Sequence, residues 1–217
     1  MILAAALMLL VTATTAVLAQ NEGPLDVPDS PALKDDSGVG TVIPYDLKGD
    51  VLGMTLELFK EKHARVSTDR RIIPVCIEAG ENDTLQCSLW SQWEEQTNWD
   101  SMGDIMLDTI AHARAETSYS FFDGQLYAID SDFSQRDFDE VKQAFLDKFG
   151  EPASSEVKEY QSGFGARFTG EVIYWSNSVS FIQLMERNER LDRSVALFIH
   201  RTLSDRQTKA GKKNPDL

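Results

Sequence analysis

Three histidines and a run of acidic residues are the side chains in this chain best suited to metal or acid–base chemistry. The histidines are His63, His112 and His200, and the sequence contains no HExxH zinc motif. Asp130 could begin a calcium loop, but Gln135 stands where such a loop has glycine and Val141 where it has glutamate. Carboxylates are favoured at helix N-termini, which accounts for the acidic run. We therefore expect no metal and no cofactor.

Nucleophilic catalysis has no recognisable motif in the sequence. No G-x-S-x-G turn is present. The glycine-rich residues 163–170 depart from a nucleotide-binding fingerprint, because Phe168 occupies the third glycine position. We expect this segment to be a turn or flexible loop between strands. A Ser, a His and an Asp assembled from distant positions remain an open alternative, and the sequence assigns no catalytic residue.

The two cysteines, Cys76 and Cys87, are expected to form a disulfide. Apolar runs at residues 72–77 and 85–89 flank the polar residues 80–84, a pattern typical of a β-hairpin. Cysteines on its facing strands would lie close enough to bond, and closing this loop would stabilise the fold by roughly 3 kcal/mol. With both thiols oxidised, neither would act as a nucleophile.

Two segments combine aromatic and polar residues in the way that contact surfaces do. The first holds Trp90, Trp93 and Trp99, with Glu94 and Glu95 between them. The second holds Phe164, Arg167 and Phe168 in the glycine-rich segment. Aromatic residues and Arg are enriched where proteins bind each other, although tryptophans more often cover a core. We expect at least one of the two segments to stay partly exposed.

Two helices are predicted from apolar spacing and capping residues. The first follows Thr55, an N-cap residue. Its apolar face comprises Leu56, Phe59 and His63. The second begins after the cap-like residues 134–137 and ends at Gly150. Its apolar face comprises Phe138, Val141, Phe145 and Phe149.

Strands are predicted over most of the remaining chain. Asp123-Gly124 is a strong hairpin turn between residues 116–122 and 125–129. Three further strands are predicted at residues 171–175, 178–185 and 194–200, and their alternation suits antiparallel pairing. Residues 90–115 fit either a helix or a strand.

Residues 1–19 are typical of a secretory signal peptide. They carry no charge, form one apolar run and end with small residues at Val17 and Ala19. Residues 20–45, rich in Pro, Gly, Asp and Ser, are predicted to be a flexible linker, and residues 204–217 a disordered basic tail. The protein would then be periplasmic or secreted, with no membrane span after cleavage.

The net charge of the chain disfavours some classes of binding partner. Its 217 residues carry a formal net charge of −14. Such acidity disfavours nucleic acid and anionic lipid, because their phosphates would be repelled. We expect a protein or cell-envelope partner.

Two short motifs resemble those of exported bacterial modules. Gly53-Met54-Thr55 opens one predicted helix, and residues 148–152 (KFGEP) close the other. In this respect the chain resembles the BamE/SmpA outer-membrane assembly lipoproteins and the β-lactamase-inhibitor-protein-like repeats. The resemblance implies helical elements packed on small antiparallel sheets, and a binding or scaffold role. The chain departs from BamE in having no Cys at the cleavage point for lipidation, and no functional residue is carried over.

The sequence therefore predicts an α+β fold with one disulfide and two helix-plus-antiparallel-sheet units. The units would span approximately residues 46–130 and 131–203, an arrangement compatible with a diverged tandem repeat. The predicted function is that of a non-catalytic binding, inhibitor-like or envelope-associated module. The alternative is an envelope hydrolase with a dispersed catalytic set.

Overall fold

A computed structural model describes residues 42–67, 70–79, 83–93, 104–105, 108–161, 163, 165–188 and 190–211. For residues 66, 67, 70, 92, 93, 104 and 105 it describes the backbone alone. All of these residues belong to one unit, Gly38–Leu217. The predicted signal peptide and most of the predicted linker lie outside the described residues.

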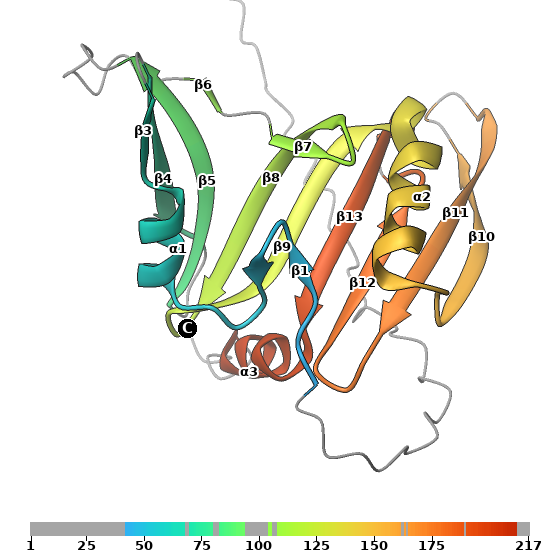
Figure 1. Ribbon diagram of the computed structural model, residues 1–217. Coiled ribbons are helices and arrows are strands. Elements are labelled where there is room, and N and C mark those ends of the chain that lie inside the picture. Colours follow the sequence, from blue (N-terminus) through green and yellow to red (C-terminus); the bar gives the residue numbers. More distant parts are fainter. Residues whose placement is uncertain are drawn as a thin grey trace, which may run out of the picture. The chain divides into compact units, whose positions relative to one another are not determined.

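The described chain is mostly β-structure with short helices between the strands (Figure 1). The strands are β1 (Asp46–Leu47), β2 (Asp50–Val51), β3 (Arg65–Ser67), β4 (Arg70–Glu78), β5 (Thr84–Trp93), β6 (Asp104–Ile105), β7 (Asp108–Ile110), β8 (Ala113–Phe122), β9 (Gln125–Ser134), β10 (Ser154–Gln161), β11 (Arg167–Ser176), β12 (Ser180–Met185) and β13 (Arg193–His200). The helices are α1 (Leu56–His63), the 3-10 turn η2 (Gln135–Asp137), α2 (Phe138–Phe149) and α3 (Arg201–Gly211).

One antiparallel sheet contains most of these strands. Their order across it is β10-β11-β12-β13-β9-β8-β5-β4-β3, with β6 beside β5 and β7 beside β8. β1 and β2 form a separate hairpin. The pairing of β9 with β13 joins segments that are far apart in sequence, and it places Phe198 opposite Ile129. This pairing makes the sheet continuous.

The prediction of two helix-plus-sheet units, at residues 46–130 and 131–203, was wrong. β9 is hydrogen-bonded to β8 along one edge and to β13 along the other, so strands from both predicted units share one sheet. The described residues hold three short α-helices, and the fold is therefore mostly β. Hydrophobic alternation predicts strands but does not specify which strands pair, so two small sheets and one large sheet look alike in sequence.

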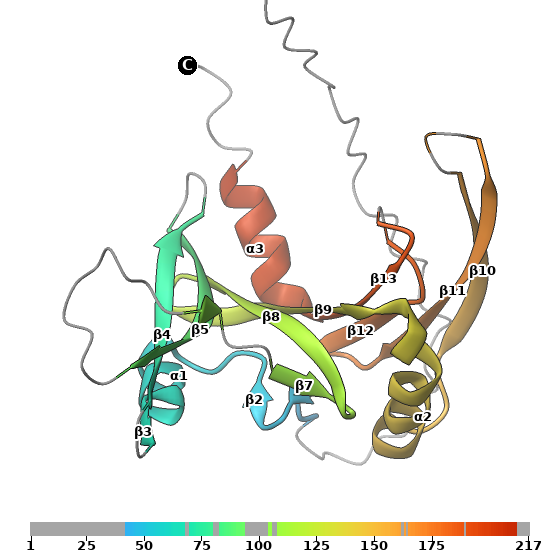
Figure 2. The ribbon, with the colours of Figure 1, turned by 90° about the horizontal axis from the view of Figure 1, so that it is seen from above.

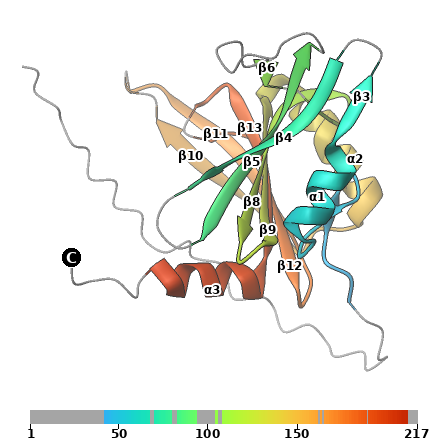
Figure 3. The same ribbon diagram turned by 90° about the vertical axis from the view of Figure 1, so that its left-hand side faces the viewer.

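Both predicted helices are confirmed. Thr55 caps α1, and its Oγ1 accepts a hydrogen bond from the backbone N–H of Leu58 at 3.2 Å. η2 leads into α2, and the Ser134 hydroxyl accepts from the backbone N–H of Arg136. α2 ends before Gly150, whose φ of 76° is a conformation that glycine adopts readily. Figures 2 and 3 show α1 and α2 on one side of the sheet and α3 on the other.

The core lies between the sheet and the helices α1 and α2. Under α2, the ring of Phe145 lies 5.7 Å from that of Trp175 and 5.8 Å from that of Phe198, between centroids. Under α1, the rings of Phe59 and Tyr119 lie 4.6 Å apart. All five side chains are buried. The apolar faces that define the two helices in sequence therefore lie on the sheet.

Helix α3 replaces part of the predicted tail. Residues 204–211, expected to be disordered, continue the helix that begins at Arg201, and residues 212–217 lie outside the described residues. Leu203 is the buried residue of α3, and one buried residue gives no periodic apolar signal in sequence. Among the described residues, no helix is long and apolar enough to cross a membrane.

Several strand predictions are confirmed or settled. Asp123 and Gly124 have φ values of 51° and 70°, as a type I′ hairpin turn requires, and they join β8 to β9. Within residues 90–115, the described part is strand, in β5, β6, β7 and β8, apart from the turn at Ala111 and His112. Residues 167–170, expected to lie in a loop, instead belong to β11, because β10 provides a partner strand along their length.

Candidate functional site

The predicted disulfide is confirmed. Cys76 of β4 and Cys87 of β5 lie directly opposite each other in the hairpin, with an S–S distance of 2.02 Å. Cys87 is fully buried, on the side of the sheet that faces α1. Neither cysteine is a free thiol, so the pair contributes stability and offers no nucleophile.

The predicted tryptophan segment is described only in part. Trp90 lies in β5, opposite Ile73 of β4, and it is half-buried. Trp93 ends β5, while its side chain and the whole of Trp99 lie outside the described residues. The role of these tryptophans as a contact surface stays a prediction.

The second predicted segment lies at the end of the sheet. Arg167 and Phe168 are the first residues of β11 and are exposed, whereas Phe164 lies outside the described residues. Phe168 is 37% exposed, and the guanidinium carbon of Arg187 lies 5.5 Å from its ring centroid. Phe168 therefore combines an exposed aromatic ring with a stacked cation.

Phe168 belongs to a larger group of aromatic side chains, which we call the aromatic patch. Side chains alternate between the two faces of a strand, so residues flanking the buried Ile173 and Trp175 point away from α2. The aromatic patch lies on this open face, across β10, β11 and β12, and consists of Tyr160, Phe168, Tyr174 and Phe181. The rings other than Phe168 are half-buried. α3 lies on the same side of the sheet (Figure 2).

Hydrogen bonds of Tyr174 and the packing of the Tyr160 ring against Gly170 hold the aromatic patch in place. The Tyr174 hydroxyl accepts from Gln183 Nε2 at 3.0 Å and donates to Glu156 at 3.4 Å. Gly170 allows the Tyr160 ring to cross β11, because a Cβ there would lie 3.1 Å from Tyr160 Cε2. Burial raises the pKa of both phenols, so they stay neutral hydrogen-bond donors. The patch is thus ordered rather than loosely exposed.

Two carboxylates of β9 lie farther along the open face. Burial, and then the charge of Asp132, raise the pKa of Asp130 to about 6. Asp132 itself binds Arg193 and also Arg190, the latter at 3.1 Å. The acidic residues that begin at Asp130 therefore do not form one loop. Asp130 and Asp132 lie in β9, whereas the acidic residues that follow them belong to η2 and the start of α2.

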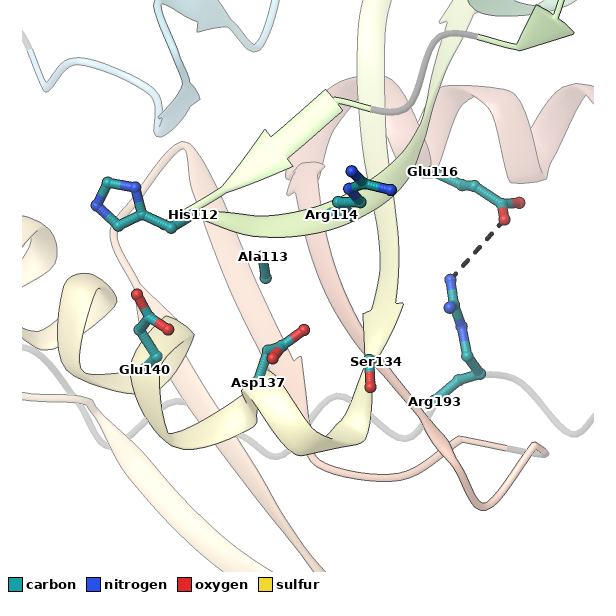
Figure 4. Close-up of a pocket in the computed structure, with 8 residues that line it drawn as sticks. All are labelled: His112, Ala113, Arg114, Glu116, Ser134, Asp137, Glu140 and Arg193. Carbon is teal, nitrogen blue, oxygen red and sulfur yellow. Dashed lines mark ion pairs between the residues drawn. The ribbon is translucent and has the colours of Figure 1, made fainter.

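A polar cleft of about 460 Å³ lies where the β7–β8 turn approaches α2 (Figure 4). Its lining residues are His112, Ala113, Arg114, Glu116, Ser134, Asp137, Glu140 and Arg193. The carboxylates of Asp137 and Glu140 come from η2 and the start of α2 and face the turn that carries His112. One ion pair joins residues of the lining, Arg193 to Glu116 at 4.0 Å. No nucleophile is placed against a base here.

The three histidines lie on separate elements. His63 ends α1, His112 occupies the β7–β8 turn with φ of 73°, and His200 ends β13. In the part of the chain that the structure describes, no group of three His, Cys, Asp or Glu side chains is placed to hold a metal ion.

Of the arrangements described, the aromatic patch is the one best suited to binding another molecule. The sequence predicted only one of its residues, Phe168. Tyr174 and Phe181 alternate with buried residues along β11 and β12, a signal that is visible only once the buried face is known. Tyr160 lies in β10, which has no buried residue, and it joins the patch because it pairs with Phe168. The aromatic rings, hydroxyls and neighbouring arginines of the patch suit molecular contact rather than acid–base chemistry. Comparisons with protein-family models, with curated proteins and with solved structures find no match for this chain.

Proposed function

We propose that this chain is an exported, non-catalytic binding module that takes a folded protein as its partner on the open face of the sheet. The observation that carries the proposal is the aromatic patch, in which arginines stack on two of the rings. The guanidinium of Arg201 lies 5.3 Å from the Phe181 ring, as that of Arg187 lies near Phe168. Tyr, Trp and Arg are the residue types that dominate binding energy at protein interfaces.

The charges of the open face support a protein partner. Lys158 pairs with Glu156 at 3.0 Å, and Arg190 and Arg193 both pair with Asp132. Pairing within the chain weakens the attraction of these cations for nucleic acid or anionic lipid. A surface that extends over neighbouring strands also suits a broad macromolecular contact better than a small molecule, which is normally enclosed in a pocket.

Export is the second part of the proposal. The signal-like residues 1–19 motivate it. The Cys76–Cys87 disulfide supports it, because disulfides persist mainly in oxidising compartments. N-terminal sequencing of material from the producing cell tests this part: a chain beginning at Gln20 supports export, and an intact Met1 contradicts it.

The binding proposal is tested by comparing three forms of the exported chain as bait for envelope proteins. The double variant Tyr160→Ser, Phe168→Ser removes two rings of the aromatic patch. The control Leu58→Ser removes an apolar side chain that is 52% exposed on α1, on the other side of the sheet. A partner held by the wild-type and control proteins should be lost by the double variant.

Direct titration of the purified partner then measures the effect. Each aromatic hot-spot residue contributes about 2 kcal/mol or more, so the double variant should bind at least tenfold more weakly, while the control should match the wild-type protein. Equal capture and equal dissociation constants for all three proteins would contradict binding on this face. Circular dichroism of each variant establishes that the sheet is intact.

A further inference from the structure

A buried polar cluster lies on the opposite side of the sheet from the aromatic patch, under the end of α1. Asp50 is 2% exposed, and its Oδ1 accepts from Lys62 Nζ at 2.6 Å and lies 2.9 Å from His63 Nε2. Tyr119 also lies close to Asp50: burial first, and then the charge of this carboxylate, raise the pKa of the Tyr119 phenol. Burial alone opposes ionisation of Asp50, but the hydrogen bonds from His63 and Lys62 outweigh it, so its pKa is lowered. The contacts from Lys62 and His63 therefore favour the ionised carboxylate of Asp50.

The β1–β2 hairpin brings two lysines together beside this carboxylate. Its turn residues, Lys48 and Gly49, have φ values of 53° and 78°, as a tight hairpin requires. The turn directs the Lys48 carbonyl at Lys62 Nζ, 3.2 Å away. The Lys48 ammonium reaches across to β7, where it binds Asp108 Oδ1 at 2.5 Å and Thr109 Oγ1 at 3.1 Å. Each lysine thus uses two bonds within the chain.

These side chains line a cavity of about 260 Å³. Its lining residues are Lys48, Asp50, Lys62, His63, Arg65, Ile72, Leu89 and Asp108. An ammonium has three N–H donors, so Lys48 and Lys62 each keep one donor unused by the bonds described above. Arg65 is exposed and forms no ion pair with any described residue. The cavity therefore holds spare donors on three cations.

The charge balance of this cavity is opposite to that of the chain. Lys48, Lys62 and Arg65 face two carboxylates, Asp50 and Asp108, which leaves one positive charge even with His63 neutral. The whole chain carries −14. Ile72 and Leu89 supply apolar walls, and Leu89 is buried. Apolar walls lower the local dielectric and strengthen the attraction between the free cation and an anion.

We propose that this cavity binds one oxyanion group, a phosphate or a carboxylate, of a small ligand. Pockets for whole drug-sized ligands are generally about 300 Å³ or larger, so this cavity suits a single acidic group with a short body. The guanidinium of Arg65 can bind two oxygens of such a group at once, and the lysines add point charges. Lys48 and Arg65 are not needed to pair Asp50, so burial of that carboxylate does not account for them.

The test is calorimetric titration of the exported chain with inorganic phosphate and, separately, with succinate at constant ionic strength. We expect saturable binding of at least one of the two, at one site per chain. Arg65→Gln should weaken that binding about tenfold or more, because it removes the unpaired cation. The anion that binds more tightly identifies the class of ligand.

The matched control is Arg71→Gln. Arg71 is exposed in β4 and precedes Ile72, but it points to the other side of the strand, so the variant makes the same change in net charge outside the cavity. It should bind as the wild-type protein does. Failure of both anions to saturate a site, or equal weakening by both substitutions, would overturn the proposal. Neither outcome depends on the aromatic patch or its partner.

Discussion

The regions beneath α1 and α2 occupy the same face of one sheet but are built differently. Under α2 the buried residues are apolar and mostly aromatic: Phe145 and Phe149 pack against Trp175 and Phe198. Under α1, Phe59 packs against Tyr119 in a similar way, but the neighbouring positions hold a carboxylate, an imidazole and an ammonium. One helix covers an apolar core, and the other covers a core joined to a polar cluster.

The apolar core under α2 is explained by stability, whereas the polar cluster under α1 calls for a functional explanation. Apolar burial stabilises a fold without any requirement for partners, whereas a buried carboxylate is tolerated only when hydrogen bonds compensate its lost hydration. Replacing such a cluster by packed apolar residues is often neutral or stabilising. Asp50, Lys62 and His63 are therefore poorly explained by stability alone, and the oxyanion cavity beside them gives them a use.

Phe145→Ala should have the largest effect, since it tests the apolar side of the comparison. Phe145 is 4% exposed, and removing a buried ring costs about 3–5 kcal/mol of unfolding free energy. Urea denaturation measures the change. Leu58→Ala, at a position 52% exposed on α1, is the control and should stay within about 0.5 kcal/mol. A loss below about 1 kcal/mol for Phe145→Ala would mean that the α2 core is not the stabilising one.

Asp50→Asn tests the polar side and should have an intermediate effect. The amide keeps the size of the carboxylate but removes the charge that Lys62 and His63 share, which should cost about 1–3 kcal/mol. The same denaturation experiment measures it. The exposed pair of Lys158 and Glu156 provides the control, because Glu156→Gln should change stability by about 0–1 kcal/mol. If Asp50→Asn lowered the free energy of unfolding no more than Glu156→Gln does, the polar cluster under α1 would make no measurable contribution to stability.

Asp130→Asn should have the smallest effect. The substitution should change only how the free energy of unfolding depends on pH. The pKa of Asp130 is raised to about 6, so its contribution to stability is complete below the ordinary value of 3.8 and is lost as the pH rises through about 6. The variant should remove this slope between about pH 4 and 6. Thermal unfolding across that range, in parallel with wild-type protein, measures it.

The carboxylate under α1 should behave in the opposite way. Because the pKa of Asp50 is lowered, its stabilisation is present above 3.8 and is lost as the pH falls through the lower folded-state value. Its effect is therefore confined to pH values below about 5, and it is common to the wild-type and Asp130→Asn proteins. Identical pH profiles for wild-type and Asp130→Asn proteins in that window would show that Asp130 is not perturbed on the open face.

Local features of the fold were predictable because a few neighbouring residues encode them. Thr55 and Gly150 mark helix boundaries through capping, and Asp123-Gly124 marks a hairpin through its backbone preference. The Cys76–Cys87 pair follows from the hairpin that contains it. In each case the interacting residues lie close together in sequence, so pattern and propensity suffice.

The single sheet and the candidate sites depend instead on distant contacts. Asp50 meets Tyr119, and Lys48 meets Asp108, only because the β1–β2 hairpin lies against β7 and β8. Nothing in the local sequence of Asp50 distinguishes it from a surface aspartate. Tyr174 likewise becomes part of a surface only when the face of β11 that carries Trp175 is known to be buried. Side-chain alternation gives two faces but does not say which one is covered.

The pairing of β9 with β13 also constrains how this protein can fold. β13 begins at Arg193, long after β9 ends at Ser134, so β9 keeps an unpaired edge until the later strands have formed. An unpaired strand edge is a template for association with other chains, and non-local pairing slows folding. In a partly folded chain that lacks β13, the free edge of β9 would therefore be a site for aggregation.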